Sequence, residues 1–348
     1  MIFSEEVINW YLKNKRDLPW RDTNDAYIIW LSEIIMQQTR VEQGMPYFNR
    51  FLENYPTVSH FASATEDEIL KLWQGLGYYS RGRNMHYTAN LVMDEHGGYF
   101  PTSYDKLIKL KGVGEYTAAA IASFSVGEAK AVVDGNVFRL LSRYFGVDIP
   151  INSTKGKKTF GELADEIMDR EQPGIYNQAV MEFGALQCKP FNPDCPTCPL
   201  RPGCYAFRNR KVKELPVKLK QVASKDRYFY YFVVSKNNRL LVNKRGANDI
   251  WQNLYELPLF ETSQAVSIEE LLASPEVRSN FGDVLAKKIT GPIKHVLSHQ
   301  NLHATFIEIQ DFEERFASKM NWQYVDYEEV RNLAQPKLIF SFLNKFLN

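Results

Sequence analysis

Apolar residues recur at helical spacing from the first residues of the chain to about residue 208, which is the pattern of helices that bury one face. Short turns interrupt it at Asn54–Pro56, at Gly97–Gly98 and at Gly146, where proline and glycine favour a change of chain direction. Residues 1–208 are therefore predicted to form a helical domain.

The pattern changes after this point. Residues 209–226 are charged and poorly periodic, which is typical of a linker. Beyond them, strands are predicted at residues 227–235, 239–245 and 303–309. Asn237–Asn238 separates the first two and favours a hairpin turn. We therefore predict a smaller α+β domain over residues 227–348, and the sequence shows no internal repeat.

Composition agrees with two folded domains. The chain has 348 residues, of which 45% are apolar and 14% aromatic, and this content excludes a disordered chain. No apolar run reaches the roughly 18 residues of a membrane span, and the first residues lack the basic and apolar regions of a secretion signal. We expect a soluble intracellular protein without a membrane anchor.

The net charge of +1 does not indicate a nucleic-acid-binding protein. Its distribution is more informative, because residues 188–220 carry eight lysines and arginines against Asp194 and Glu214. Such a run is as often a solvated face as a nucleic-acid surface, so both interpretations stay open.

All four cysteines lie close together with the spacing C-x6-C-x2-C-x5-C, at Cys188, Cys195, Cys198 and Cys204. Four soft thiolates suit an iron–sulfur cluster or a tetrahedral zinc ion. Zinc sites more often show two C-x2-C pairs or added histidines, and disulfides fit poorly without a secretion signal. The spacing favours a cluster and leaves zinc as the alternative.

A short glycine hairpin, Lys111–Gly114, is predicted between a helix that ends at Leu110 and an alanine-rich helix that begins near Glu115. Gly112 and Gly114 let the backbone approach a ligand closely, and the free N–H groups of a helix start attract an anion such as a DNA phosphate. The Gly-Val-Gly motif alone also fits an ordinary helical turn.

Two carboxylates occupy unusual positions. Glu33 lies in the apolar helix AYIIWLSEIIMQQ, where a carboxylate is costly unless it is paired, protonated or functional. Burial raises the pKa of a carboxyl group, so Glu33 can donate a proton near neutral pH. Asp134 precedes the helix expected at residues 135–145, where its simplest role is an N-cap.

The hairpin, the segment Val133–Val137 and the cysteine loop, in this order, resemble the helix–hairpin–helix DNA glycosylases related to endonuclease III. Further motifs narrow the resemblance to the adenine DNA glycosylases, the MutY family: Arg16–Arg21, Trp30–Thr39 and Gly75–Arg81. The resemblance is dense over residues 4–208 and looser beyond. It implies a six-helix-type barrel with its hairpin at residues 107–125, and a [4Fe–4S] cluster held by the loop 188–204.

The resemblance also implies roles for the carboxylates. Glu33 would protonate N7 of adenine and then help to activate water, and Asp134 would stabilise the sugar cation, with Asn136 assisting in positioning. Tyr116 stands where the related glycosylase–lyases carry a lysine. Because a phenol cannot form a Schiff base, we expect simple hydrolysis that leaves an abasic site.

Base removal requires the nucleotide to be flipped out of the duplex. In the family, residues at the positions of Gln38 and Tyr78 wedge into the base stack, with Met36 and Thr39 close by. The adenine pocket is shaped by residues that match Arg16, Trp20, Arg21 and Gln178. Without the resemblance, Tyr78 would be taken for a core aromatic, and the pocket residues for ordinary packing or surface pairs.

The C-terminal domain resembles the Nudix fold at residues 238–258. Residues 259–290 lack the R-E-x-x-E-E run of the Nudix catalytic box, so we expect DNA binding rather than nucleotide hydrolysis. The family inspects oxidised guanine with a Phe-Ser-His turn, which here reads Leu297-Ser298-His299. Ser298 and His299 keep the polar pair, and the leucine alters packing at the first position.

Together these features predict a monomeric, cytoplasmic enzyme that works at a bacterial nucleoid and removes adenine opposite 8-oxoguanine, or more weakly guanine, in double-stranded DNA. Sliding-clamp or mismatch-repair partners cannot be read from the sequence. The first alternative is an endonuclease III-like glycosylase–lyase, which Tyr116 and the added domain disfavour. The second is a non-catalytic DNA-binding protein, which would need neither Glu33 nor Asp134.

Overall fold

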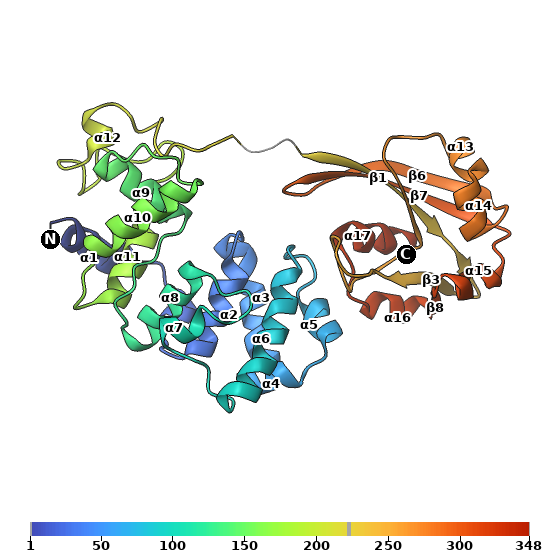
Figure 1. The fold of residues 1–348 in the computed structure, drawn as a ribbon, viewed down its shortest axis with the longest axis horizontal. Helices are drawn as coiled ribbons and strands as arrows, with labels where there is room; N and C mark the ends of the chain where they lie inside the picture. Colours follow the sequence, from blue (N-terminus) through green and yellow to red (C-terminus); the bar gives the residue numbers. More distant parts are fainter. Residues whose placement is uncertain (1, 221–223, 348) are drawn as a thin grey trace. The chain divides into compact units, whose positions relative to one another are not determined.

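The computed structural model describes residues 2–220 and 224–347. Its contacts divide the chain into two compact units (Figure 1). The helical unit comprises residues 1–63 and 84–220, and the mixed unit comprises residues 64–83 and 221–348. Among the helices of the described ranges, none has the length and apolar content needed to cross a membrane.

Helices account for the regular structure of the helical unit, as the periodicity predicts. They are α1 (Ile2–Asn14), η1 (Pro19–Arg21), α2 (Ala26–Met36), α3 (Val41–Asn54), α4 (Val58–Ser63), α6 (Ser80–His96), α7 (Tyr104–Leu107), α8 (Glu115–Val126), α9 (Gly135–Phe145), α10 (Thr154–Glu166), α11 (Pro173–Leu186) and α12 (Tyr205–Arg208), of which α6 starts in the mixed unit.

The core of the helical unit is centred on α11, which packs against α1, α8 and α9 (Figure 1). Its largest buried side chains include Tyr11 of α1, Phe160 of α10 and Phe183 of α11. Because α8 and α9 both pack against α11, the start of α9 and one face of α8 lie close to α11. The candidate site lies there.

The predicted hairpin is confirmed between α7 and α8. Helix α7 already ends at Leu107, and a turn continues to the start of α8 at Glu115. Gly112 has φ +81°, and a Cβ there would stand 2.9 Å from the Cβ of Asn84. Only glycine fits this position without strain.

The chain stays on the helical unit for about a dozen residues beyond α12. Ile151 N donates to the carbonyl of Val217 at 3.0 Å, and Leu215 is buried. Residues 209–220 of the predicted linker are thus part of this unit, while residues 221–223 lie outside the described residues.

The mixed unit contains the strands together with shorter helices. Its elements are α5 (Glu66–Leu72), β1 (Lys225–Val233), β2 (Ser235–Lys236), β3 (Arg239–Lys244), β4 (Tyr255–Glu256), β5 (Leu259–Thr262), α13 (Ile268–Ala273), α14 (Pro275–Phe281), β6 (Leu285–Val296), β7 (Gln300–Gln310), α15 (Glu314–Lys319), β8 (Gln323–Asp326), α16 (Tyr327–Asn332) and α17 (Lys337–Phe346).

Two sheets organise these strands. The larger has the order β5-β1-β7-β6, with β1 parallel to β7 and the other pairs antiparallel. The smaller joins β2, β3 and β4, with β8 paired to β3. Strand β1 is buried on both faces, since Tyr231 packs with α17 on one side and Phe232 packs with α14 on the other. This double burial explains its unbroken apolar run.

The predicted strands are confirmed, with one change in pairing. Asn237 and Asn238 have φ of 51° and 58°, as a tight hairpin turn with two left-handed residues requires. They connect β2 to β3, whereas β1 pairs with β5 and β7. The α+β class predicted for this part of the chain holds.

Residues 64–83 belong to the mixed unit although they are distant in sequence from its strands. The Asp67 carboxylate accepts from Lys244 Nζ at 2.7 and 2.9 Å. Tyr79 donates its hydroxyl to the carbonyl of Gln335 at 3.1 Å. This segment brings the predicted wedge residue Tyr78 into the mixed unit.

Candidate active site

Glu33 lies on α2, directly opposite the start of α8. The N-cap Asp25 accepts from Tyr27 N at 2.8 Å and begins α2. The neighbouring turns of the helix are mostly apolar and buried, and Glu33 itself is 9% exposed. Tyr116 of α8 donates its hydroxyl to Glu33 Oε2 at 2.6 Å. The structure thus brings two predicted site residues into direct contact.

Burial changes the acidity of this pair. It raises the pKa of Glu33 to about 7, against the opposing effect of the Tyr116 hydrogen bond, and the negative charge of Asp134 adds to the rise. Burial also raises the pKa of Tyr116 well above its usual value, so the phenol stays protonated. Near neutral pH the Glu33 carboxyl therefore exists in both protonation states.

Asp134 is the N-cap of α9. Its Oδ1 accepts from the backbone N–H groups of Asn136 and Val137, both at 2.8 Å. Its Oδ2 accepts from the Asn136 side-chain amide at 2.8 Å. Burial raises the pKa of Asp134, and these hydrogen bonds oppose the rise. The carboxylate that caps α9 is therefore the same group that the sequence analysis singled out as a candidate site residue.

Arg139 fixes the orientation of the Asn136 amide. Its Nη2 donates to Asn136 Oδ1 at 2.9 Å, and its Nε donates to the carbonyl of Cys188 at 2.7 Å. Because the amide oxygen accepts from Arg139, the amide nitrogen is turned toward Asp134. Arg139 therefore holds the Asn136 amide in the orientation in which it donates to Asp134.

Glu182 of α11 is a site residue that the sequence analysis missed. Its carboxylate is 1% exposed and forms paired hydrogen bonds with Arg16 (2.9 and 2.7 Å) and Arg21 (3.0 and 2.7 Å). Burial opposes its ionisation, but the bonds from Arg16 and Arg21 hold the pKa of Glu182 at about 2. A lone glutamate in the apolar helix IYNQAVMEFGAL was the available signal, the same as for Glu33.

The other predicted pocket residues lie in the same unit. Trp20 packs edge-on against Phe48 with ring centroids 5.1 Å apart. Gln178 accepts a hydrogen bond from the Tyr11 hydroxyl. The positive charge of Arg21, which pairs with Glu182, opposes the rise that burial causes in the pKa of Glu33. Arg21 therefore lies near Glu33.

The predicted wedge residues share a backbone feature. Gln38 is exposed with φ 56°, and Tyr78 is 45% exposed with φ 47°. Left-handed φ is uncommon outside glycine and concentrates at functional sites. Next to Gln38, Met36 and Thr39 are half-buried. Exposure of Tyr78 excludes its alternative role as a core aromatic.

Gly114 stands at the N-cap of α8, and a Cβ built there meets nothing within 4 Å. The backbone at this helix start is therefore open to a ligand, as an anion site requires. Gly112, in contrast, is required by the turn itself.

The four cysteines of the loop are free thiols that line one small cavity, together with Arg143. Arg143 Nη1 donates to the carbonyl of Lys189 at 2.7 Å and lies 3.5 Å from Cys188 Sγ. Among the described residues, no three His, Cys, Asp or Glu side chains converge on a single ion.

In the mixed unit, Ser298 and His299 are exposed in the turn between β6 and β7. The Ser298 hydroxyl is hydrogen-bonded to the hydroxyl of Tyr78. Leu297 is half-buried and packs against the core beneath the turn. A cavity of about 480 Å³ lies beside the turn and is also lined by Tyr78 and Trp251.

Comparison with known proteins agrees with this geometry. Residues 31–165 match the HhH-GPD superfamily of base excision DNA repair proteins, and residues 230–345 match a NUDIX domain. The matched segment includes Glu33, the hairpin and Asp134, and it places the chain in the class of base-excision DNA glycosylases. The adenine DNA glycosylase of Buchnera aphidicola subsp. Schizaphis graminum is 32% identical over 99% of each chain. The chain therefore belongs to the adenine DNA glycosylase family.

Further relatives extend the same result. The human adenine DNA glycosylase is 41% identical over 61% of this chain and 41% of its own length. A solved thermostable thymine-DNA glycosylase is 27% identical, with a TM-score of 0.56 over 60% of this chain and 96% of its own. An endonuclease III in a DNA complex, 21% identical with a TM-score of 0.52 over 60% of this chain and 95% of its own, shares the fold.

Proposed function

We propose that this chain hydrolyses the N-glycosidic bond of adenine opposite 8-oxoguanine, and more weakly opposite guanine, and leaves an abasic site in double-stranded DNA. The observation that carries the proposal is the buried Glu33 carboxyl, whose pKa is about 7, in contact with Tyr116 and close enough to Asp134 for their charges to interact. Two neighbouring carboxyl groups, one of which can donate a proton near neutral pH, are what hydrolysis of a glycosidic bond requires.

Each carboxyl has its own part. Protonated Glu33 donates to N7 of the adenine, which makes the base a better leaving group. Ionised Asp134 stabilises the positive charge that develops on the sugar. Once Glu33 is ionised, it accepts a proton from the attacking water. The Tyr116 hydroxyl orients the Glu33 carboxyl throughout.

The residues beside this pair favour hydrolysis without strand cleavage. A lyase uses an amine to form a Schiff base with the sugar, and position 116 supplies a phenol. The paired arginines keep Glu182 ionised, so its carboxylate and the Arg16 and Arg21 guanidiniums present acceptors and donors suited to the edge of a purine. Trp20 and Gln178 complete this adenine pocket.

DNA contacts come from both units. Gly112 and Gly114 present the backbone of the hairpin to a phosphate. Gln38, supported by Met36 and Thr39, and Tyr78 fill the gap left by the flipped nucleotide. In the mixed unit, Ser298 and His299 line a cavity of about 480 Å³ and contact the base opposite adenine.

The cysteine loop fits a [4Fe–4S] cluster. All four thiols face one cavity, and Arg143 neutralises negative charge next to Cys188. Cys188, Cys195, Cys198 and Cys204 would hold the cluster, which crosslinks the loop with four metal–thiolate bonds when bound. Arg139 donates to the Cys188 carbonyl and to Asn136, so the loop supports the start of α9.

The cluster is tested by composition. Purified protein is expected to contain iron and acid-labile sulfide in equal amounts, and Cys198→Ser is expected to lose both because one corner loses its ligand. Lys189→Gln, an exposed change in the same loop, is the control and should keep the iron content. Zinc in place of iron and sulfide would support the alternative site.

The activity is tested by single-turnover adenine release. A duplex with one adenine opposite 8-oxoguanine is expected to lose that adenine, while an adenine–thymine duplex stays intact. Strands should break only after alkali, and borohydride should trap no covalent complex, because Tyr116 offers no amine. Robust trapping with spontaneous breakage would instead identify a glycosylase–lyase. Duplex binding without release would indicate the non-catalytic alternative.

A further inference from the structure

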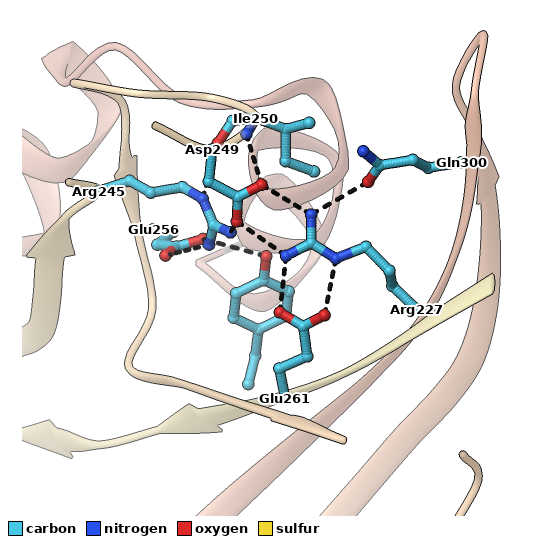
Figure 2. Close-up of polar contacts among 8 residues, drawn as sticks. Arg227, Arg245, Asp249, Ile250, Glu256, Glu261 and Gln300 are labelled. Carbon is cyan, nitrogen blue, oxygen red and sulfur yellow. Dashed lines mark hydrogen bonds and ion pairs between the residues drawn. The ribbon is translucent and has the colours of Figure 1, made fainter. Parts of the chain in front are cut away.

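Arg227, on β1, donates hydrogen bonds to three side chains from all of its guanidinium N–H groups (Figure 2). Its Nε and Nη2 donate to Glu261 at 2.7 and 2.6 Å. Its Nη1 and Nη2 donate to Asp249 at 2.7 and 2.8 Å, and Nη1 also donates to Gln300 Oε1 at 3.0 Å. These five bonds occupy the five donors of a guanidinium.

Strand register brings these residues together. Lys225 of β1 pairs with Gln300 of β7, and Phe229 of β1 pairs with Glu261 of β5. Arg227 lies between Lys225 and Phe229, so Gln300 and Glu261 are its diagonal neighbours on one face of the sheet. The Arg227 side chain is 11% exposed, and its guanidinium lies 4.8 Å from the Phe229 ring centroid. A charge in this position needs its carboxylate partners.

A second arginine holds the loop that carries Asp249. Arg245 Nε donates to the carbonyl of Ile250 at 2.7 Å, and its Nη2 donates to Asp249. Three residues of this loop have left-handed backbones, with φ of 68° at Asn248, 61° at Trp251 and 63° at Asn253. Side chains other than glycine rarely adopt such φ values. The loop conformation therefore depends on the bonds that Asp249 and Ile250 receive from the two arginines.

Two of the three partners of Arg227, Asp249 and Gln300, are among the residues that line one cavity. Asp249, Ile250 and Trp251 line one side of the cavity of about 480 Å³, and the turn Leu297–Gln300 lines another. Arg227 is bonded to Asp249 on the first wall and to Gln300 on the second (Figure 2). The planar guanidinium of Arg227 thus fixes the distance between the loop that carries Asp249 and the turn that carries Ser298 and His299.

We propose that Arg227 is a positioning residue for recognition of the base opposite adenine, acting through Asp249 and Gln300. The inference rests on the proposed role of Ser298 and His299 in that recognition. A lysine could not replace Arg227, because an ammonium is a point charge without a planar fork. Glu261 bonds the Nε–Nη2 edge of the guanidinium, and Asp249 bonds the adjacent Nη1–Nη2 edge. Glu261 thus anchors Arg227 to β5, and it is not among the residues that line the cavity.

This geometry supplies a matched pair of variants. Asp249→Asn and Glu261→Gln each remove one carboxylate from Arg227, at side chains that are 35% and 36% exposed, and each leaves the other carboxylate in place. Only Asp249→Asn changes a wall of the cavity. A purely structural role predicts a loss of stability from both variants, larger in Asp249→Asn because Asp249 also accepts from Arg245, and no change in selectivity.

The measurement is single-turnover adenine release by the full chain, opposite 8-oxoguanine and opposite guanine, together with thermal unfolding. Asp249→Asn is expected to lower the ratio of the two rates by about tenfold, the size of one charge-assisted hydrogen bond, while Glu261→Gln leaves the ratio within about twofold. Arg227→Lys should lower the ratio as Asp249→Asn does. An unchanged ratio in Asp249→Asn, or equal changes in the matched pair, would overturn the inference.

Ser298→Ala separates this inference from the function on which it rests. If Ser298→Ala lowers the ratio and Asp249→Asn does not, the recognition role stands and the Arg227 inference fails. If wild-type protein has no preference for 8-oxoguanine, the proposed recognition fails, and the inference fails with it.

Discussion

Replacing Glu33 by glutamine should slow adenine release by about 10²–10⁴-fold, the usual contribution of a general acid, while duplex affinity stays nearly constant. Glutamine keeps the shape of the side chain and can still accept the 2.6 Å hydrogen bond from Tyr116. Its amide is not acidic and cannot transfer a proton to the base. Single-turnover release opposite 8-oxoguanine, with binding measured in parallel, checks both parts.

The pH dependence gives an independent readout of the same residue. The acid must be protonated, and burial places the pKa of Glu33 at about 7, so the wild-type rate should fall as pH rises above 7. The residual rate of Glu33→Gln should lack this fall. Glu162→Gln, at a side chain 66% exposed on α10, is the matched control. Wild-type turnover in Glu33→Gln would refute the assignment of the acid.

Replacing Asp134 by asparagine should lower the rate by about 10²–10³-fold, the usual effect of removing one group that stabilises charge in the transition state. Asparagine is as good an N-cap as aspartate, so its side-chain oxygen can still accept from the N–H groups that begin α9. The helix should therefore survive while the negative charge beside the sugar is lost. Rate and unfolding temperature are both measured.

Asp134→Ala provides the comparison. It removes the cap as well as the charge, and should cost about 1 kcal/mol of stability in addition to the lost rate. If Asp134→Asn retained full activity with a normal unfolding temperature, Asp134 would be a cap and nothing more. If both variants lost activity only in proportion to unfolding, the same conclusion would follow.

Sequence reasoning was most successful where the determining interactions are local. Helix α9 begins and ends where the pattern predicts, because Asp134 supplies the cap and Gly146 adopts the left-handed backbone that ends the helix. The hairpin at Gly112 and the turn at Asn237–Asn238 likewise follow from residues that tolerate positive φ. Glu33 was noticeable because a carboxylate is rare in an apolar helix.

The features that were missed depend on residues far apart in the chain. Glu182 acquires its meaning from Arg16 and Arg21, more than 160 positions earlier. Arg227 is defined by the parallel pairing of β1 with β7, which no periodicity reveals. The packing of Leu297 depends on the core beneath its turn. Patterns predict elements, whereas these contacts follow from how the elements are assembled.

The assignment of residues 64–83 to the mixed unit has a consequence for modularity. Residues 31–165 and 230–345 match two different family models. This division suggests two independent domains that could be separated at the linker and exchanged between proteins. The structure argues otherwise, because residues 64–83 are hydrogen-bonded to the C-terminal segment. Asp67 accepts from Lys244, Tyr79 donates to the carbonyl of Gln335, and Arg83 donates to the carbonyl of Gln252. A C-terminal piece grafted onto a foreign glycosylase would arrive without these partners. The two segments are therefore expected to be inherited, and engineered, as one evolutionary unit.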